Sequence, residues 1–136
     1  MWFAVSSSSE KSYNCIIVLG PTAVGKTAIG VALARAFNGE IISADSRQTY
    51  RHLDIGSGKD LADYAESSEG PAVPYHLIDI TELPAEYNVY NYQQDFYKAF
   101  KDIKENASGG CICFLMGIQI SQFLGKAEYE SILNFA

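Results

Sequence analysis

A glycine-rich segment near the N-terminus constrains the fold of this chain more than any other feature. Residues 20–27 follow the pattern G-x-x-x-x-G-K-[ST] without a gap. An apolar run at residues 15–19 precedes them and is typical of a strand buried on both faces. From Lys26 onward the apolar residues recur at helical spacing. This order of strand, turn and helix predicts a phosphate-binding loop made of Gly20, Pro21, Thr22, Ala23, Val24, Gly25, Lys26 and Thr27.

Such a loop has the chemistry of an anion site. Gly20 and Gly25 permit backbone angles that a side chain would forbid, so the loop amides can turn inward around an anion. The helix that follows presents its positive N-terminal end to the same point. Lys26 would supply a full charge to phosphate groups, and the Thr27 hydroxyl is placed to hold Mg²⁺. The alternative is a glycine-rich turn with a surface lysine, which the flanking strand and helix disfavour.

The remaining pattern predicts an α/β chain. A helix begins at Lys26, buries Ile29, Leu33 and Phe37 together with Ala28, Ala32 and Ala36, and stops at Asn38-Gly39. Further strands are expected at residues 40–44, 75–80 and 111–116, a helix at 88–104, and short helices at 118–124 and 128–135. Residues 45–70 are polar and glycine-containing, which indicates a loop with short helical turns.

These elements predict a P-loop NTPase-like, three-layer fold with a mostly parallel sheet. We divide the chain into a flexible leader at residues 1–12, a P-loop core at 13–117 and an atypical C-terminal tail at 118–136. The total of 136 residues is near the usual size of a single domain.

Composition excludes some classes of protein. The net charge of −6 argues against a freestanding nucleic-acid binder but leaves room for a small polyanionic ligand in one local pocket. The three cysteines lie in apolar runs and suit buried thiols in a reducing cytosol better than a disulfide framework. No apolar stretch reaches the length of a membrane span. We therefore expect a cytoplasmic protein, monomeric and without a membrane partner.

Four polar residues follow the second predicted strand: Asp45, Ser46, Arg47 and Gln48. In an open α/β sheet, the end of a strand beside the phosphate loop faces the ligand crevice. There Asp45 could bind Mg²⁺ or act as a base, Arg47 could clamp a phosphate or a carboxylate, and Gln48 could read a base edge. Asp45 is equally suited to cap a helix.

Two histidines and four tyrosines are further functional candidates. His76 lies in a predicted strand and is interpreted as a structural histidine, while His52 lies in the polar segment and is expected to be exposed. The tyrosines could stack on bases, but packing of the helix against the sheet is the more economical interpretation. They are Tyr87, Tyr90, Tyr92 and Tyr97.

Four motifs together resemble the tRNA dimethylallyltransferases, also called tRNA isopentenyltransferases. They are Gly-Pro-Thr-Ala-Val-Gly-Lys-Thr at 20–27, Ile-Ile-Ser-Ala-Asp-Ser-Arg-Gln-Thr-Tyr at 41–50, Asp-Ile-Gly-Ser-Gly-Lys at 54–59 and Tyr-His-Leu-Ile-Asp-Ile at 75–80. They occur in the family's order, and the resemblance covers residues 14–115 and corresponds to the N-terminal portion of the family. It therefore implies that the P-loop fold of this chain is incomplete at its C-terminus.

This resemblance implies transfer of a prenyl group from dimethylallyl diphosphate to the exocyclic amine of an adenosine next to the tRNA anticodon. The loop would then hold a diphosphate leaving group, with Lys26 and a Mg²⁺ ion on Thr27 neutralising its charge. By the same resemblance, Thr22 would contact the diphosphate near the breaking bond, and Asp45 would be the general base. Residues 45–48 would meet the tRNA. Spacing alone leaves Thr22 open as a turn-stabilising hydroxyl.

The resemblance weakens after the last predicted strand. The family pattern there is Gly-Gly-Thr-Gly-Leu-Tyr, whereas residues 116–121 read Met-Gly-Ile-Gln-Ile-Ser. If Gly117 matches the second glycine, Ile118 replaces a threonine that contacts substrate in the family. Lys126 is the sole basic residue after Lys104, although tRNA binding needs several phosphate contacts.

The sequence is compatible with three functions. The first is a member of the transferase family with a truncated or frame-altered chain and impaired activity. The second is a small P-loop metabolite kinase, which would share residues 20–27 but would need an arginine-rich lid that the sequence lacks. The third is a phosphate-binding remnant without catalytic activity.

Overall fold

The computed structural model describes residues 15–21, 23–45, 47–106 and 112–117. The predicted leader at 1–12, the tail at 118–136 and the two short helices predicted within that tail lie outside these residues. The elements in chain order are β1 (Cys15–Gly20), α1 (Lys26–Ala36), β2 (Glu40–Ala44), the 3₁₀ helix η1 (Leu61–Tyr64), β3 (Tyr75–His76), α2 (Val89–Asn106) and β4 (Ile112–Gly117).

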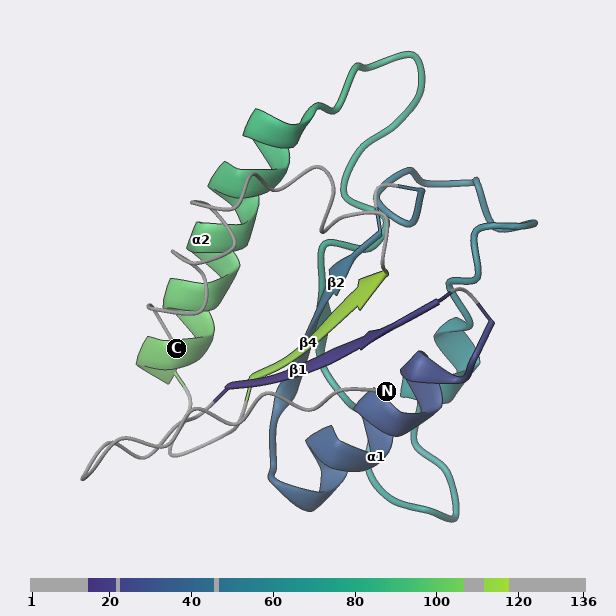
Figure 1. Ribbon diagram of the computed structural model, residues 1–136, viewed down its shortest axis with the longest axis vertical. Helices are drawn as coiled ribbons and strands as arrows, with labels where there is room; N and C mark the ends of the chain where they lie inside the picture. The colour runs from purple at the N-terminus through teal and green to yellow at the C-terminus, as the bar shows by residue number, and fades with distance from the viewer. Residues whose placement is uncertain (1–14, 22, 46, 107–111, 118–136) are drawn as a thin grey trace.

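The four strands form one parallel sheet in the order β1-β4-β2-β3 (Figure 1). The last strand of the described chain therefore lies between the first two. Its register pairs Gly117 with Gly20 on one side and Met116 with Ala44 on the other. The carboxyl ends of β1, β4 and β2 consequently meet at a single edge of the sheet, where both predicted functional segments begin.

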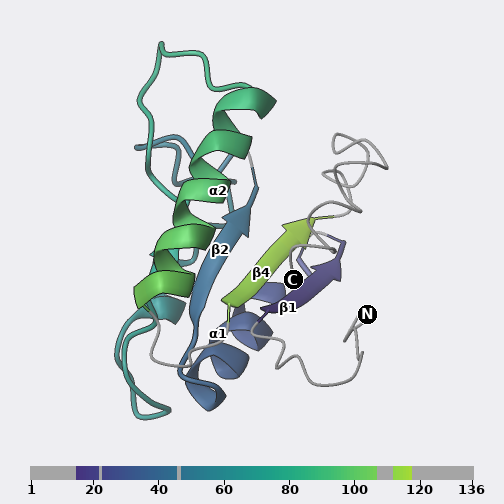
Figure 2. The same cartoon turned by 90° about the vertical axis from the view of Figure 1, so that its left-hand side faces the viewer.

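Alternating residues of the strands build two hydrophobic layers. Ile17 and Ile42 pack in a cluster with Phe96, Ala99 and Ile103 of α2. Their neighbours along the strands, Val18 and Ile41, pack in a second cluster with residues of α1 and η1. The sheet thus lies between α2 on one face and α1 with η1 on the other (Figure 2), which confirms the predicted three-layer α/β fold.

Helix α1 packs through smaller residues than the sequence pattern predicts. Its buried residues are Gly30, Val31 and Ala34, and Ile29 and Leu33 are only partly buried against the same cluster. Small side chains at the contact allow the helix to approach the sheet closely, so the buried stripe is rotated from the predicted one. The prediction of a buried face was therefore wrong for Ala28, Ala32, Ala36 and Phe37, which are exposed.

The predicted helix signals are confirmed at both helices. Asn38 takes a left-handed φ of 51° after α1, and the amide of Gly39 donates a hydrogen bond to the Ala34 carbonyl at 2.7 Å. At the start of α2, Asn88 and Asn91 cap each other, since each side-chain oxygen accepts from the other's backbone amide at 3.0 and 3.1 Å. Helix α2 runs to Asn106 instead of Lys104.

The third strand is shorter than predicted. It comprises only Tyr75–His76, because Leu77 and Asp79 adopt positive φ angles of 64° and 55° and leave the extended conformation. The segment after β3 instead makes hydrogen bonds to the loop after β2, where the amide of Asp79 donates to the Gln48 carbonyl at 2.9 Å. His76 is held by Glu40, with Nε2 and Oε2 2.6 Å apart, which supports its structural interpretation. His52 is exposed, as expected.

A buried lysine connects these two loop segments. The side chain of Lys59 is 3% exposed, and Nζ lies 2.6 Å from Asp79 Oδ1 and 3.0 Å from Asp54 Oδ1. It also donates to the Tyr50 carbonyl at 2.6 Å. Burial lowers the pKa of Lys59, but hydrogen bonds and charges from Asp79 and Asp54 outweigh burial and leave the pKa raised. The ammonium therefore stays charged and ties residues 50–54 to the segment after β3.

Among the described residues, neither α1 nor α2 combines the length and the hydrophobicity that a membrane-spanning helix requires.

A pair of identical substitutions tests the buried core. Ile42 is 0% exposed and Ile55 is 99% exposed. We expect Ile42→Ala to lower the free energy of unfolding by about 3 kcal/mol, because it leaves a cavity in the sheet–α2 layer. Ile55→Ala should change it by less than about 0.5 kcal/mol. Urea denaturation followed by far-UV circular dichroism measures both, and equal losses would contradict the packing described.

A second pair tests the buried lysine. Lys59→Met should lower the free energy of unfolding by about 2 kcal/mol, since Asp79 would lose its close cationic partner. Lys101→Met is the control, because Lys101 is exposed and pairs only with Glu105 one helical turn away. The control should cost less than about 0.5 kcal/mol. Thermal denaturation of both variants makes the comparison, and an unaffected Lys59→Met protein would show that the network is dispensable.

Candidate functional site

The phosphate loop has the predicted strand–turn–helix context. Strand β1 ends at Gly20 and α1 begins at Lys26, with Ala23 and Gly25 between them at positive φ angles of 61° and 85°. A Cβ atom on Gly20 would lie only 3.3 Å from Val24 Cγ2, so this position favours glycine. Gly25 supplies no side-chain cap to α1, and the first turn of the helix carries no acidic residue. The positive end of α1 therefore faces the loop without a side chain to neutralise it.

Lys26 folds back across its own loop. Its Nζ donates to the carbonyl of Pro21 at 2.5 Å. Burial lowers the pKa of the Lys26 ammonium below its ordinary value, and the negative charge of Asp45 opposes this shift in part. The charge of Asp45 therefore acts on the phosphate loop, although 18 residues lie between Lys26 and Asp45 in the sequence.

Thr27 lies beside the 3₁₀ helix. Burial raises the pKa of the Tyr64 phenol to about 12, and a hydrogen bond with Thr27 opposes this shift. In the part of the chain that the structure describes, no group of three or more His, Cys, Asp or Glu side chains is arranged to hold a metal. A Mg²⁺ ion at Thr27 is still chemically reasonable, because Mg²⁺ commonly takes few protein ligands and completes its shell with phosphate oxygens and water.

Asp45 is held by its neighbour Arg47. Oδ1 accepts from the Arg47 amide at 3.0 Å and from Nε at 3.2 Å, while Oδ2 accepts from Nη2 at 3.0 Å. The bond to the backbone amide makes Asp45 the cap of a turn, as Asp often is. The expected alternative of a helix cap was wrong, since residues 47–49 form a turn and no helix follows directly.

Gln48 has a role inside the protein that the sequence did not indicate. Its side-chain oxygen accepts from Ser43 Oγ at 2.7 Å, and Nε2 donates to the carbonyls of Gly58 at 2.9 Å and Ser57 at 3.3 Å. Gln48 is buried, and it connects the end of β2 to the loop that Lys59 closes. Its predicted contact with tRNA stays a prediction.

Sequence reasoning also missed Lys59, whose only signal was its position in the motif at 54–59. A lysine in a polar, glycine-containing segment is expected to be solvated, and only the tertiary contacts reveal its burial. Thr22 and Ser46 lie outside the described residues, so the roles predicted for them stay predictions.

The four tyrosines do not act as one cluster. Tyr92 packs against the core of α2 and donates to the Ser43 carbonyl at 3.2 Å, as the packing interpretation requires. Tyr87 donates to Asp95 Oδ2 at 2.7 Å. Tyr90 is 67% exposed, so the packing interpretation was wrong for this residue. Tyr97 is 40% exposed, and its ring lies edge-on to that of Phe96.

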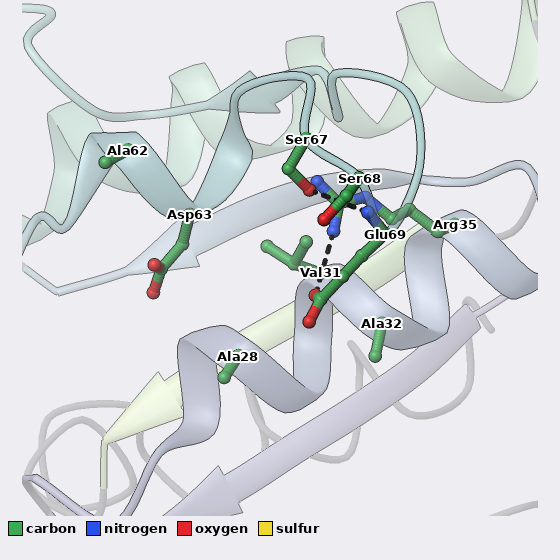
Figure 3. Close-up of a pocket in the computed structure, with 9 residues that line it drawn as sticks. All are labelled: Ala28, Val31, Ala32, Arg35, Ala62, Asp63, Ser67, Ser68 and Glu69. Carbon is green, nitrogen blue, oxygen red and sulfur yellow. Dashed lines mark hydrogen bonds and ion pairs between the residues drawn. The ribbon is translucent and has the colours of Figure 1, made fainter.

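A separate cleft of about 280 Å³ lies between α1 and the segment that follows η1 (Figure 3). Arg35 closes one end of it, because its guanidinium donates to the carbonyls of Ala65 at 2.9 Å and Pro71 at 3.1 Å. Nη1 of Arg35 also lies 3.6 Å from Glu69 Oε2. None of the residues that line the cleft belongs to the phosphate loop or to residues 45–48, so it is not part of the candidate site.

Two family profiles match this chain. The profile described as IPP transferase matches residues 48–117, and the profile described as isopentenyl transferase matches residues 13–70. Together they cover the phosphate loop, the segment at 45–48 and the buried Lys59.

Curated relatives show the same similarity. The chain is 60% identical over 122 residues to tRNA dimethylallyltransferase 2 of Shewanella sediminis, which covers 90% of this chain and 38% of that protein. It is 56% identical over 126 residues to tRNA dimethylallyltransferase 2 of Treponema denticola, covering 93% and 39% respectively. This chain thus spans less than two fifths of the length of these relatives.

Solved structures agree in fold. A tRNA delta(2)-isopentenylpyrophosphate transferase from Staphylococcus epidermidis superposes with a TM-score of 0.60 at 34% identity, covering 79% of this chain and 32% of that one. A tRNA isopentenylpyrophosphate transferase from Bacillus halodurans superposes with a TM-score of 0.57 at 36% identity, covering 78% and 32%. With these likenesses and the profile matches, the chain belongs to the tRNA dimethylallyltransferase family, also called the IPP transferases.

Proposed function

We propose that this chain takes part in tRNA modification, the transfer of a dimethylallyl group from dimethylallyl diphosphate to the exocyclic amine of an adenosine next to the anticodon. The observation that carries the proposal is the position of a phosphate loop and of Asp45 at the same edge of the sheet. Gly20 ends β1 and Ala44 ends β2, and both strands pair with β4. Strands lie about 4.8 Å apart, so these two ends are separated by roughly 10 Å.

The phosphate loop forms the diphosphate half of this site. Backbone N–H groups of the loop after Pro21 and the N-terminus of α1 receive the leaving group, and Lys26 exchanges the Pro21 carbonyl for phosphate oxygens. The family resemblance assigns Thr22 to the oxygen at the breaking bond. Mg²⁺ held through Thr27 would supply charge neutralisation as the carbon–oxygen bond of the diphosphate breaks.

Asp45 forms the acceptor half. As the adenine nitrogen bonds to the prenyl carbon and diphosphate leaves, the amine loses a proton, which Asp45 accepts as general base. A carboxylate offers about four acceptor positions. Arg47 donates three hydrogen bonds to Asp45, two to Oδ1 and one to Oδ2. The hydrogen bonds that the described residues make to Asp45 thus leave one position on Oδ2 for the amine.

The side chains of residues 45–48, the proposed tRNA contact, differ in exposure. Asp45 and Arg47 have side chains accessible from solvent, whereas Gln48 is buried and its backbone amide and carbonyl are bonded to Asp45 and Asp79. A net charge of −6 leaves few cations for phosphate contacts. We infer that most contacts with tRNA are made by parts of the relatives' length that this chain does not match. A cytoplasmic, monomeric protein fits the proposal.

Neither alternative function is favoured. A metabolite kinase would share the phosphate loop but not the whole set of family matches across residues 13–117. A remnant without catalytic activity would keep the loop and lose transfer, so an activity measurement separates it from the enzyme.

The first experiment measures prenyl transfer. The chain is incubated with labelled dimethylallyl diphosphate, Mg²⁺ and unmodified tRNA, and Asp45→Asn is expected to lower transfer by roughly 100-fold or more while pyrophosphate binding persists. Lys101→Ala, which removes an exposed lysine of α2, is the control and should transfer normally. ATP turnover stimulated by a small metabolite, without prenyl transfer, would overturn the proposal.

The second experiment measures binding of Mg²⁺–pyrophosphate by calorimetry. Lys26→Ala should weaken binding by roughly 10- to 100-fold, because a charge-assisted contact with the phosphates is lost. Circular dichroism checks that the variant is folded. Binding that Lys26→Ala abolishes, together with no transfer by the unmodified chain, would identify the non-catalytic remnant. Unchanged binding in the variant would refute the assignment of the loop.

A further inference from the structure

The guanidinium of Arg47 binds the carboxylate of Asp45. The two side chains form a bidentate pair, with Nε 3.2 Å from Oδ1 and Nη2 3.0 Å from Oδ2. This geometry uses the planar fork of arginine, which lysine cannot reproduce. The side chain of Arg47 is 50% exposed and that of Asp45 is 28% exposed, so the pair lies near the surface and not in the core.

The position of Asp45 creates an electrostatic problem for the proposed substrate. Its carboxylate follows the end of β2, two strands from the end of β1, where the phosphate loop starts. Its charge also acts on Lys26 of that loop. Diphosphate is itself strongly anionic, and because the Asp45 side chain is only 28% exposed, its charge is screened less than that of a fully exposed carboxylate at the same distance of about 10 Å. An uncompensated carboxylate here would therefore repel the ligand that the loop is built to bind.

We propose that Arg47 is a positioning residue that neutralises and orients Asp45, and thereby keeps the phosphate loop receptive to diphosphate. This inference rests on the proposed function, in which the loop binds diphosphate and Asp45 is the base. It assigns Arg47 to a partner within the chain, whereas the family resemblance places it in a patch that meets tRNA. Arg47 then acts on diphosphate through Asp45, without touching the phosphate groups.

Two other roles for Arg47 make different predictions. As a direct ligand of the diphosphate, it would contribute to binding whether or not Asp45 is charged. If Arg47 contacts a tRNA phosphate, Arg47→Ala would leave diphosphate binding unchanged. It would weaken tRNA binding and make that binding less dependent on salt concentration. A double-mutant cycle separates these roles, because it measures how far the effect of one residue depends on the other.

The cycle compares the chain with Arg47→Ala, Asp45→Asn and the double variant, using Mg²⁺–pyrophosphate as the probe in calorimetry. We expect Arg47→Ala alone to weaken binding by about 3- to 10-fold, and Asp45→Asn alone to leave it unchanged or tighter. In the double variant, removal of Arg47 should have almost no effect beyond that of Asp45→Asn. Raising the salt concentration should reduce the effect of Arg47→Ala.

Controls keep the outcomes distinct. Lys101→Ala removes one positive charge from the far end of α2 and should bind pyrophosphate normally, so a general effect of net charge would be recognised. Arg47→Lys should recover only part of the loss, since it cannot form the bidentate pair. Circular dichroism confirms that each variant is folded.

The inference is overturned if Arg47→Ala weakens binding equally with Asp45 or Asn at position 45, or if it changes nothing. An unmodified chain that fails to bind pyrophosphate would refute the diphosphate site and this inference together. A chain that binds, shows the expected coupling and transfers no prenyl group would refute only the catalytic part of the proposed function.

Discussion

The parallel pairing of β4 with both β1 and β2 is the constraint on which the rest of the structure depends. Because the last strand of the described chain lies between the first two, the ends of β1 and β2 meet at one edge. That edge carries the phosphate loop after Gly20 and Asp45 after Ala44. The two hydrophobic clusters, one against α2 and one against α1, hold the sheet in place from both faces.

Polar contacts beyond the sheet hold the loops at this edge. Gln48 connects Ser43 of β2 to the carbonyls of residues 57 and 58, and Lys59 connects the same loop to Asp79. Both side chains are buried and satisfied by partners within the chain. Their contacts restrain the segment that begins at Asp45. In the proposed reaction a general base must be positioned closely, so these interior contacts support the catalytic geometry without touching substrate.

Several features of the fold were predictable from the sequence because the sequence patterns that specify them are local. The structure confirms three features that each depend on a few neighbouring residues. They are the strand–turn–helix context of the phosphate loop, the left-handed stop at Asn38-Gly39 and the cap at Asn88. The predictions were wrong where contacts with distant segments outweigh the local sequence pattern. The run at 75–80 has the apolar character of a strand, yet its second half bonds to the loop after β2. Phe37 fits the apolar pattern of α1, but the helix packs through Gly30 and Ala34.

The sequence by itself determined the type of elements, their order, the glycine-rich loop between β1 and α1 and membership of the family, because each depends on residues close together in the chain. Only the tertiary structure decided which side chains serve the interior and which remain for a ligand. Gln48 and Lys59 are polar residues that the fold buries, and Lys59 lies 2.6 Å from Asp79, which follows a different strand. The physical reason is that the partners of a polar side chain are set by how distant segments meet, which no local pattern records.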